Sequence, residues 1–115
     1  IKEKQVGFEA VKAEYEALAK ANENSWRILF SIANVFSYNE YFKEAIQMWQ
    51  KTFDCMPKPR YTDSFEAMAQ CCVRMGDHES AVEYYKKELE LLREDWGLKY
   101  GAEVEALEEK IRALQ

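Results

Sequence analysis

Apolar residues recur along most of the chain at the spacing of one face of an α-helix. The first such stretch covers residues 3–21, in which one side of a helix carries Phe8, Val11, Tyr15 and Leu18. The same periodicity predicts five more helices, at residues 26–38, 41–55, 63–75, 78–95 and 102–114. No stretch alternates apolar and polar positions as a β-strand does, and the connections are short. We therefore expect an all-α chain of about six helices, paired in antiparallel hairpins.

Capping and turn-forming residues separate these helices. Ser25 is placed to cap the second helix, and Thr62 or Asp63 to cap the fourth. Pro57 and Pro59 end the third helix because a proline nitrogen cannot donate a backbone hydrogen bond. Turns without glycine are expected at residues 22–25 and at YNEY, residues 38–41, and turns with glycine at Gly76-Asp77 and at residues 95–101.

One pattern of bulky and small residues occurs twice, 36 positions apart. The first copy consists of Leu29, Ile32, Ala33 and Phe36, followed by Ala45 and Trp49. The second copy consists of Phe65, Met68, Ala69 and Cys72, followed by Ala81 and Tyr85. This pattern resembles the tetratricopeptide repeat, in which a bulky, small and bulky series on one helix precedes Ala-x3-aromatic on the next.

The resemblance implies one helical domain over residues 1–115, built as a stack of antiparallel helix hairpins. Its parts would be a half repeat at 3–21, full repeats at 26–59 and 62–95, and a capping helix at 102–114. Small alanines would let the two helices of each hairpin approach closely. The last helix carries an apolar stripe, which we expect to pack on the 78–95 helix and the end of 63–75: Val104, Leu107, Ile111 and Leu114.

Tetratricopeptide arrays bind partners on a concave face formed by the first helix of each repeat, so the resemblance implies a protein or peptide partner. The corresponding positions are Arg27, Phe30, Asn34, Ser37 and Tyr38 in the first repeat and Asp63, Glu66, Gln70, Val73 and Arg74 in the second. Asn34 matches an asparagine that clamps a carboxylate in chaperone-binding members, whereas Phe30 stands where those members carry lysine. An ordinary solvated face is the alternative for these positions.

The segment from Met56 to Ile111 is similar to the C-terminal tetratricopeptide region of bacterial regulators that carry an N-terminal lambda-repressor-type helix-turn-helix. Its ending, LLREDWGLKYGAEV, is also similar to the bacterial transcriptional activator domain. These resemblances imply a cytoplasmic regulatory region downstream of a DNA-binding part, which fits the absence of an initiator Met. A net charge of −5 argues against direct nucleic-acid binding by this segment. No apolar run approaches the roughly 18 residues of a membrane span.

Residues able to carry chemistry are few and scattered, so we expect no enzyme activity, no cofactor and no metal. His78, the single histidine, lies in a turn, where packing rather than proton transfer is expected. The acidic residues of the last helix lie off its apolar face, which favours a solvated face over a metal site: Glu103, Glu105, Glu108 and Glu109. The three cysteines lack CxxC spacing and are expected to be reduced thiols, with Cys71 and Cys72 packed as small apolar residues.

Two other functions remain open from the sequence. The half repeat at 3–21 could pair with a second copy through Phe8, Val11 and Tyr15, which would make the chain a self-assembly module that forms a homodimer. A small-molecule sensor would instead need a closed apolar pocket, and the sequence does not show whether one exists.

Overall fold

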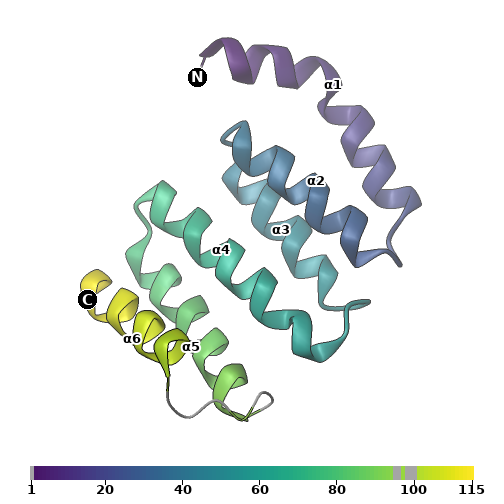
Figure 1. Cartoon of the computed structure of the whole chain (residues 1–115). Helices are drawn as coiled ribbons and strands as arrows, with labels where there is room; N and C mark the ends of the chain where they lie inside the picture. Colours follow the sequence, from purple (N-terminus) through teal and green to yellow (C-terminus); the bar gives the residue numbers. More distant parts are fainter. Residues whose placement is uncertain (1, 95–96, 98–100) are drawn as a thin grey trace. The chain divides into compact units, whose positions relative to one another are not determined.

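The described part of the chain is built from helices (Figure 1). The computed structural model describes residues 2–94, 97 and 101–115, and within them the side chains of all but residues 2–8 and Pro59. This part contains α1 (Lys2–Ala21), α2 (Trp26–Tyr38), α3 (Phe42–Thr52), the 3-10 helix η1 (Lys58–Arg60), α4 (Tyr61–Met75), α5 (His78–Glu94) and α6 (Ala102–Leu114). No strand occurs among these residues, and the all-α prediction is confirmed. None of the described helices combines the length and apolar character that a membrane crossing requires.

Helix ends were predicted well except around the third and fourth helices. α3 ends at Thr52 rather than at 55, because the chain tightens there into a turn in which the amide of Cys55 donates to the Thr52 carbonyl at 3.1 Å. α4 begins at Tyr61, two residues earlier than predicted, because η1 runs directly into it. Thr62 and Asp63 therefore lie inside α4, and the predicted cap from either side chain is wrong.

Other predicted boundaries are confirmed or fall outside the described residues. The Ser25 hydroxyl accepts a hydrogen bond from the Ile28 amide at 3.4 Å and caps α2, as predicted. Most of the predicted turn at 95–101, and the side chains of Phe8 and Pro59, lie outside the described part.

The two hairpins, α2–α3 and α4–α5, close with the same backbone turn 36 residues apart. The amide of Glu40 donates to the carbonyl three residues back at 3.0 Å, and that of Tyr41 to the carbonyl five residues back at 2.9 Å. The amides of Gly76 and Asp77 make the equivalent bonds at 3.0 and 2.9 Å. Glu40 and Gly76 both adopt a left-handed conformation, with φ of 68° and 81°. The repeat seen in the sequence thus reappears in the backbone.

The two turns carry different residues at the left-handed position, which predicts opposite effects of two substitutions. Glu40→Gly should raise the free energy of unfolding by about 1 kcal/mol, because glycine avoids the steric penalty of a Cβ at positive φ. It also removes Glu40 Oε2, which is buried without a hydrogen-bond partner in the described structure. Gly76→Ala should lower the free energy of unfolding by about 1 kcal/mol through conformation alone, since a Cβ there would meet no atom within 4 Å. Urea unfolding followed by circular dichroism checks both, and a Glu40→Gly variant no more stable than the parent would contradict the prediction.

In the unit of residues 1–56, α2 and α3 form an antiparallel hairpin and α1 packs against α2 (Figure 1). The hairpin core consists of residues at most 3% exposed: Leu29, Ile32, Ala33, Phe36, Ala45 and Trp49. The predicted apolar face of α1 is wrong at Leu18, which is 46% exposed. Ala19, 2% exposed, is buried instead, because a one-residue shift turns the contact face by about 100° around the helix. Val11 and Tyr15, proposed for pairing with a second copy, are half-buried.

A charged contact joins α1 to the hairpin. Lys12 Nζ lies 3.2 Å from Glu44 Oε2 and 5.0 Å from the centre of the Tyr41 ring. The hydrogen bond to Glu44 raises the pKa of Lys12, so this lysine keeps its charge. The pair is partly exposed and is therefore expected to orient α1 more than to stabilise it.

In the unit of residues 57–115, α4 and α5 form the second hairpin and α6 packs on α5 (Figure 1). One core cluster joins the three helices and contains Ala69, Val82, Tyr85, Leu89, Leu92, Val104, Leu107 and Ile111. Leu114 packs against this cluster while partly exposed, so the apolar stripe of the last helix and its packing on α5 are confirmed. Toward α4, however, α6 meets Glu66 and Ala69 in the first two thirds of that helix, and not its end as predicted. Ala69 and Ala81, the small residues of the second repeat, are both 0% exposed.

All three cysteines are free thiols. Cys71 and Cys72 are each 1% exposed, and they pack as small apolar residues, as predicted. Burial, with a smaller effect of the Asp77 charge, raises the pKa of Cys72 to about 11. This thiol is therefore protonated at neutral pH and a poor nucleophile.

Candidate functional site

The predicted partner positions on α2 share one helical face but differ in exposure. Arg27 and Asn34 are exposed, and Tyr38 is 65% exposed. Phe30 is half-buried, and its ring meets Trp49 edge to face with centroids 6.0 Å apart. Ser37 is only 8% exposed and offers little surface to a partner. Within this helix, the accessible part of the predicted face is therefore formed by its two ends and Asn34.

The predicted positions on α4 separate into two groups. Asp63 and Glu66 are half-buried near the start of the helix, whereas Gln70, Val73 and Arg74 are exposed toward its end. The first group is tied to neighbouring charges, Asp63 Oδ2 to Arg60 at 3.8 Å and Glu66 Oε1 to Lys110 at 3.6 Å. The second group includes an apolar side chain, since Val73 is 37% exposed.

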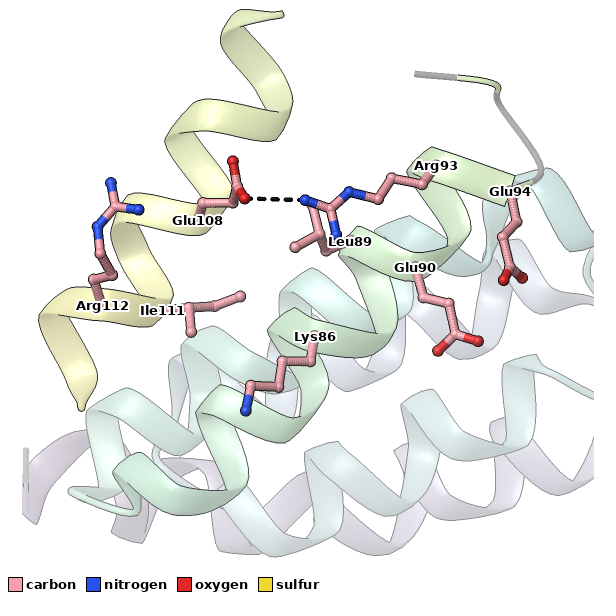
Figure 2. Close-up of a pocket in the computed structure, with 8 residues that line it drawn as sticks. All are labelled: Lys86, Leu89, Glu90, Arg93, Glu94, Glu108, Ile111 and Arg112. Atoms are coloured by element: carbon pink, nitrogen blue, oxygen red, sulfur yellow. Dashed lines mark hydrogen bonds and ion pairs between the residues drawn. The ribbon is translucent and has the colours of Figure 1, made fainter. Parts of the chain in front are cut away.

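A groove of about 530 Å³ runs between α5 and α6 (Figure 2). Its apolar residues are Leu89 and Ile111, and long charged side chains surround them. Figure 2 shows Arg93 reaching from α5 to Glu108 of α6, and the two make an ion pair of 3.0 Å. This pair is partly exposed, and no residue that lines the groove has a buried polar atom without a hydrogen-bond partner among the described residues. The groove therefore carries weaker evidence for a ligand than a buried, unpartnered polar group would.

A second pocket, of about 430 Å³, lies between α4, α5 and α6, and we call it the Glu88 pocket. Its wall includes Asp63 and Glu66 of α4, Glu88 and Leu92 of α5, and Leu107 and Lys110 of α6. Glu88 is 8% exposed, and its Oε1 has no hydrogen-bond partner among the described residues. A buried carboxylate oxygen without a partner is costly, and such groups concentrate at functional sites.

Burial is the main reason why the pKa of the Glu88 carboxyl differs from its ordinary value. It raises the pKa of this carboxyl to about 8, helped by the negative charges of Glu66, Asp63 and Glu103 and opposed by Lys110. The Tyr85 hydroxyl, whose pKa is also raised by burial, stands on the same helix. At neutral pH Glu88 is therefore mostly neutral, and it ionises only when a cation or a higher pH favours its charge.

The sequence predictions missed Glu88, although the pattern contained a signal for it. Ala81, Tyr85, Glu88 and Leu92 follow the spacing of one helical face, so the glutamate falls inside the buried stripe of α5. Thirty-six residues earlier the chain carries Thr52, which is 0% exposed and satisfies its hydroxyl by donating to the Trp49 carbonyl. The signal in the sequence is therefore a glutamate at a position whose equivalent in the first repeat is buried.

The other candidate chemistry stays on the surface. His78, Glu105 and Glu109 are exposed, and Glu108 is half-exposed in the pair with Arg93. Glu103 is exposed as well, although it also lines part of the Glu88 pocket. Across the described part of the chain, no three His, Cys, Asp or Glu side chains are arranged to hold a metal ion.

The chain matches none of the protein-family models, and no curated protein matches it significantly.

Proposed function

We propose that the chain is a non-catalytic module that binds proteins or peptides, in the manner of tetratricopeptide-like repeats, through the exposed face of α2 in the 1–56 unit and that of α4 in the 57–115 unit, each considered by itself. One observation carries this proposal. The described residues include three exposed large apolar side chains, Leu18, Tyr38 and Val73, and two of these occupy predicted partner positions. Exposed apolar side chains flanked by polar ones are typical of protein interaction surfaces.

The polar residues on these helices suit an extended polypeptide. Asn34 and Gln70 are exposed amides that can both donate to and accept from a peptide backbone. Arg27 and Arg74 are exposed guanidinium groups, which can bind acidic side chains or a carboxylate. Tyr38 adds apolar contact area on α2 and Val73 adds it on α4, so the proposed partner of each face is a peptide segment with apolar and acidic residues.

A peptide-display selection tests the proposal. Peptides enriched on the parent chain should bind the Tyr38→Ala, Val73→Ala double variant at least tenfold more weakly, because a few anchor side chains supply most of the binding energy at such interfaces. Gln47→Ala with Glu83→Ala, two exposed positions on α3 and α5, serves as the matched control and should bind like the parent. Fluorescence anisotropy gives the dissociation constants. Equal binding of all three proteins, or no enriched peptide, would contradict the proposal.

We also propose that this module is the cytoplasmic regulatory region of a bacterial transcription factor, with DNA binding supplied by another part of the protein. The similarity of residues 56–111 to regulator effector regions supports this, and so does the net charge of −5, which disfavours phosphate binding by this segment. The coding sequence upstream of Ile1 tests it, since absence of a helix-turn-helix there would remove the proposal.

A further inference from the structure

The Glu88 pocket contains more negative than positive groups. Four carboxylates line it, those of Asp63, Glu66, Glu88 and Glu103, together with two cationic side chains, Arg60 and Lys110. Both cations already stand beside other carboxylates, Arg60 at 3.8 Å from Asp63 and Lys110 at 3.6 Å from Glu66. Among the residues that the structure describes, no ion pair reaches Glu88, the most buried of the four carboxylates.

The residues that line the pocket limit which kind of cation can bind in it. Leu92, Ala106 and Leu107 form an apolar part of the lining beside Glu88. A volume of about 430 Å³ lies within the range of small-molecule sites, which are apolar with a few polar groups that orient the ligand. A hydrated metal ion would gain nothing from the apolar wall, and no metal-holding cluster exists among the described residues.

We propose that the Glu88 pocket binds an organic ammonium group carried on a short aliphatic chain. The ammonium donates hydrogen bonds to the Glu88 carboxylate, and the aliphatic chain lies against Leu92 and Leu107. Asp63, Glu66 and Glu103 add negative potential around the charge. Two sources share this chemistry, a free alkylamine and a lysine side chain of another protein.

Lys110 competes with such a ligand. Its Nζ lies 3.6 Å from Glu66 Oε1 and 5.6 Å from the centre of the Tyr85 ring, so it covers the same region with the same type of group. An external ammonium must displace this lysine head or share the carboxylates with it. Replacing Lys110 by a side chain without a positive charge should therefore strengthen ligand binding.

Binding is coupled to the proton on Glu88. The pKa of about 8 leaves this group mostly protonated at pH 7, so arrival of an ammonium releases a proton. An alkylammonium keeps its own charge up to a pH of about 10. Affinity should therefore rise on the order of tenfold per pH unit from pH 6 toward pH 8. The charged groups that face Glu88 are Asp63 and Glu66 of α4 and Glu103 and Lys110 of α6.

The probes are n-butylammonium chloride and Nα-acetyl-lysine amide, with n-butanol as a neutral control at matched salt. We expect both ammonium probes to shift backbone amide signals of the Glu88 pocket in NMR titrations at pH 8. We also expect at least tenfold weaker binding to Glu88→Gln and tighter binding to Lys110→Met. Glu90→Gln, an exposed glutamate two residues along α5, is the matched control and should bind like the parent.

The outcomes separate the alternatives. If n-butanol shifts the amide signals as much as the ammonium probes do, the pocket binds apolar chains without recognising charge, and the proposal is overturned. Unchanged binding to Glu88→Gln, or equal affinity at pH 6 and pH 8, would also overturn it. Tighter binding of acetyl-lysine amide than of n-butylammonium assigns the pocket to a lysine of a partner, and the reverse order assigns it to a free amine. The inference goes beyond the proposed peptide binding, because these small probes do not require Tyr38 or Val73.

Discussion

Raising the pH from 5 to 9 is expected to lower the free energy of unfolding of the 57–115 unit by about 3 kcal/mol through Glu88. In the folded chain the pKa of this carboxyl is about 8, against an ordinary value of 4.5. Between these values the folded state binds more protons than the unfolded state, so stability is highest at the acidic side and falls as pH rises. A full shift would correspond to about 5 kcal/mol at 1.36 kcal/mol per unit, and water reaching the ionised group reduces this.

The measurement is urea unfolding at pH 5, 6, 7, 8 and 9, followed by NMR signals of α4, α5 and α6 so that this unit is observed separately. Glu88→Gln keeps the shape of the side chain and removes its ionisation, so most of the pH dependence should disappear. Glu90→Gln should keep the slope of the parent protein. If the parent and Glu88→Gln lose stability in parallel from pH 5 to pH 9, the carboxyl of Glu88 does not titrate as described.

Deleting residues 102–115 is expected to destabilise the same unit severely. The deletion removes three buried apolar side chains, Val104, Leu107 and Ile111, which are 2%, 4% and 7% exposed. At about 1.5–3 kcal/mol for each, the loss is at least about 4 kcal/mol, a large share of the roughly 5–15 kcal/mol that stabilises a typical domain. The melting temperature should fall by at least about 15 °C, with a helical circular dichroism spectrum retained at low temperature.

Two full-length variants control this deletion. Replacing Val104, Leu107 and Ile111 by serine should reproduce the loss without shortening the chain. Replacing the exposed Glu105 and Glu109 by alanine should change the melting temperature little, because both side chains point away from the core. A deletion variant that melts within about 3 °C of the parent would show that α6 does not stabilise the unit, and the role of a capping helix would be wrong.

The sequence was sufficient for elements whose signals are local. The bounds of α2 and α6 match their predictions, because Ser25 caps one and an apolar stripe defines the other. Two features depended on contacts with other helices. Leu18 and Ala19 are adjacent and both apolar, so only packing against α2 decides that the alanine is buried. The end of α3 depended on a tight turn that competes with the helix near Thr52.

The candidate sites divide in the same way. Aligning the two repeats places Tyr38 and Val73 on the partner-binding face, and both are exposed. The same alignment places Ser37 on that face, but Ser37 is buried. Glu88 escaped prediction because its surroundings come from residues far along the chain, Asp63 and Glu66 before it and Lys110 after it. Helical periodicity places Glu88 on a buried stripe, but only the packing of three helices shows that one of its oxygens lacks a partner.

The buried thiols of α4 can be used to measure how often the helices around them open. Cys71 and Cys72 are each 1% exposed, whereas Cys55 is half-buried in a turn. A disulfide reagent reaches an enclosed thiol only during transient opening of the surrounding helices. The rate at which these two sulfurs become modified under native conditions therefore reports how often the second hairpin separates. A ligand held among α4, α5 and α6 would slow that rate without any label being added to the protein.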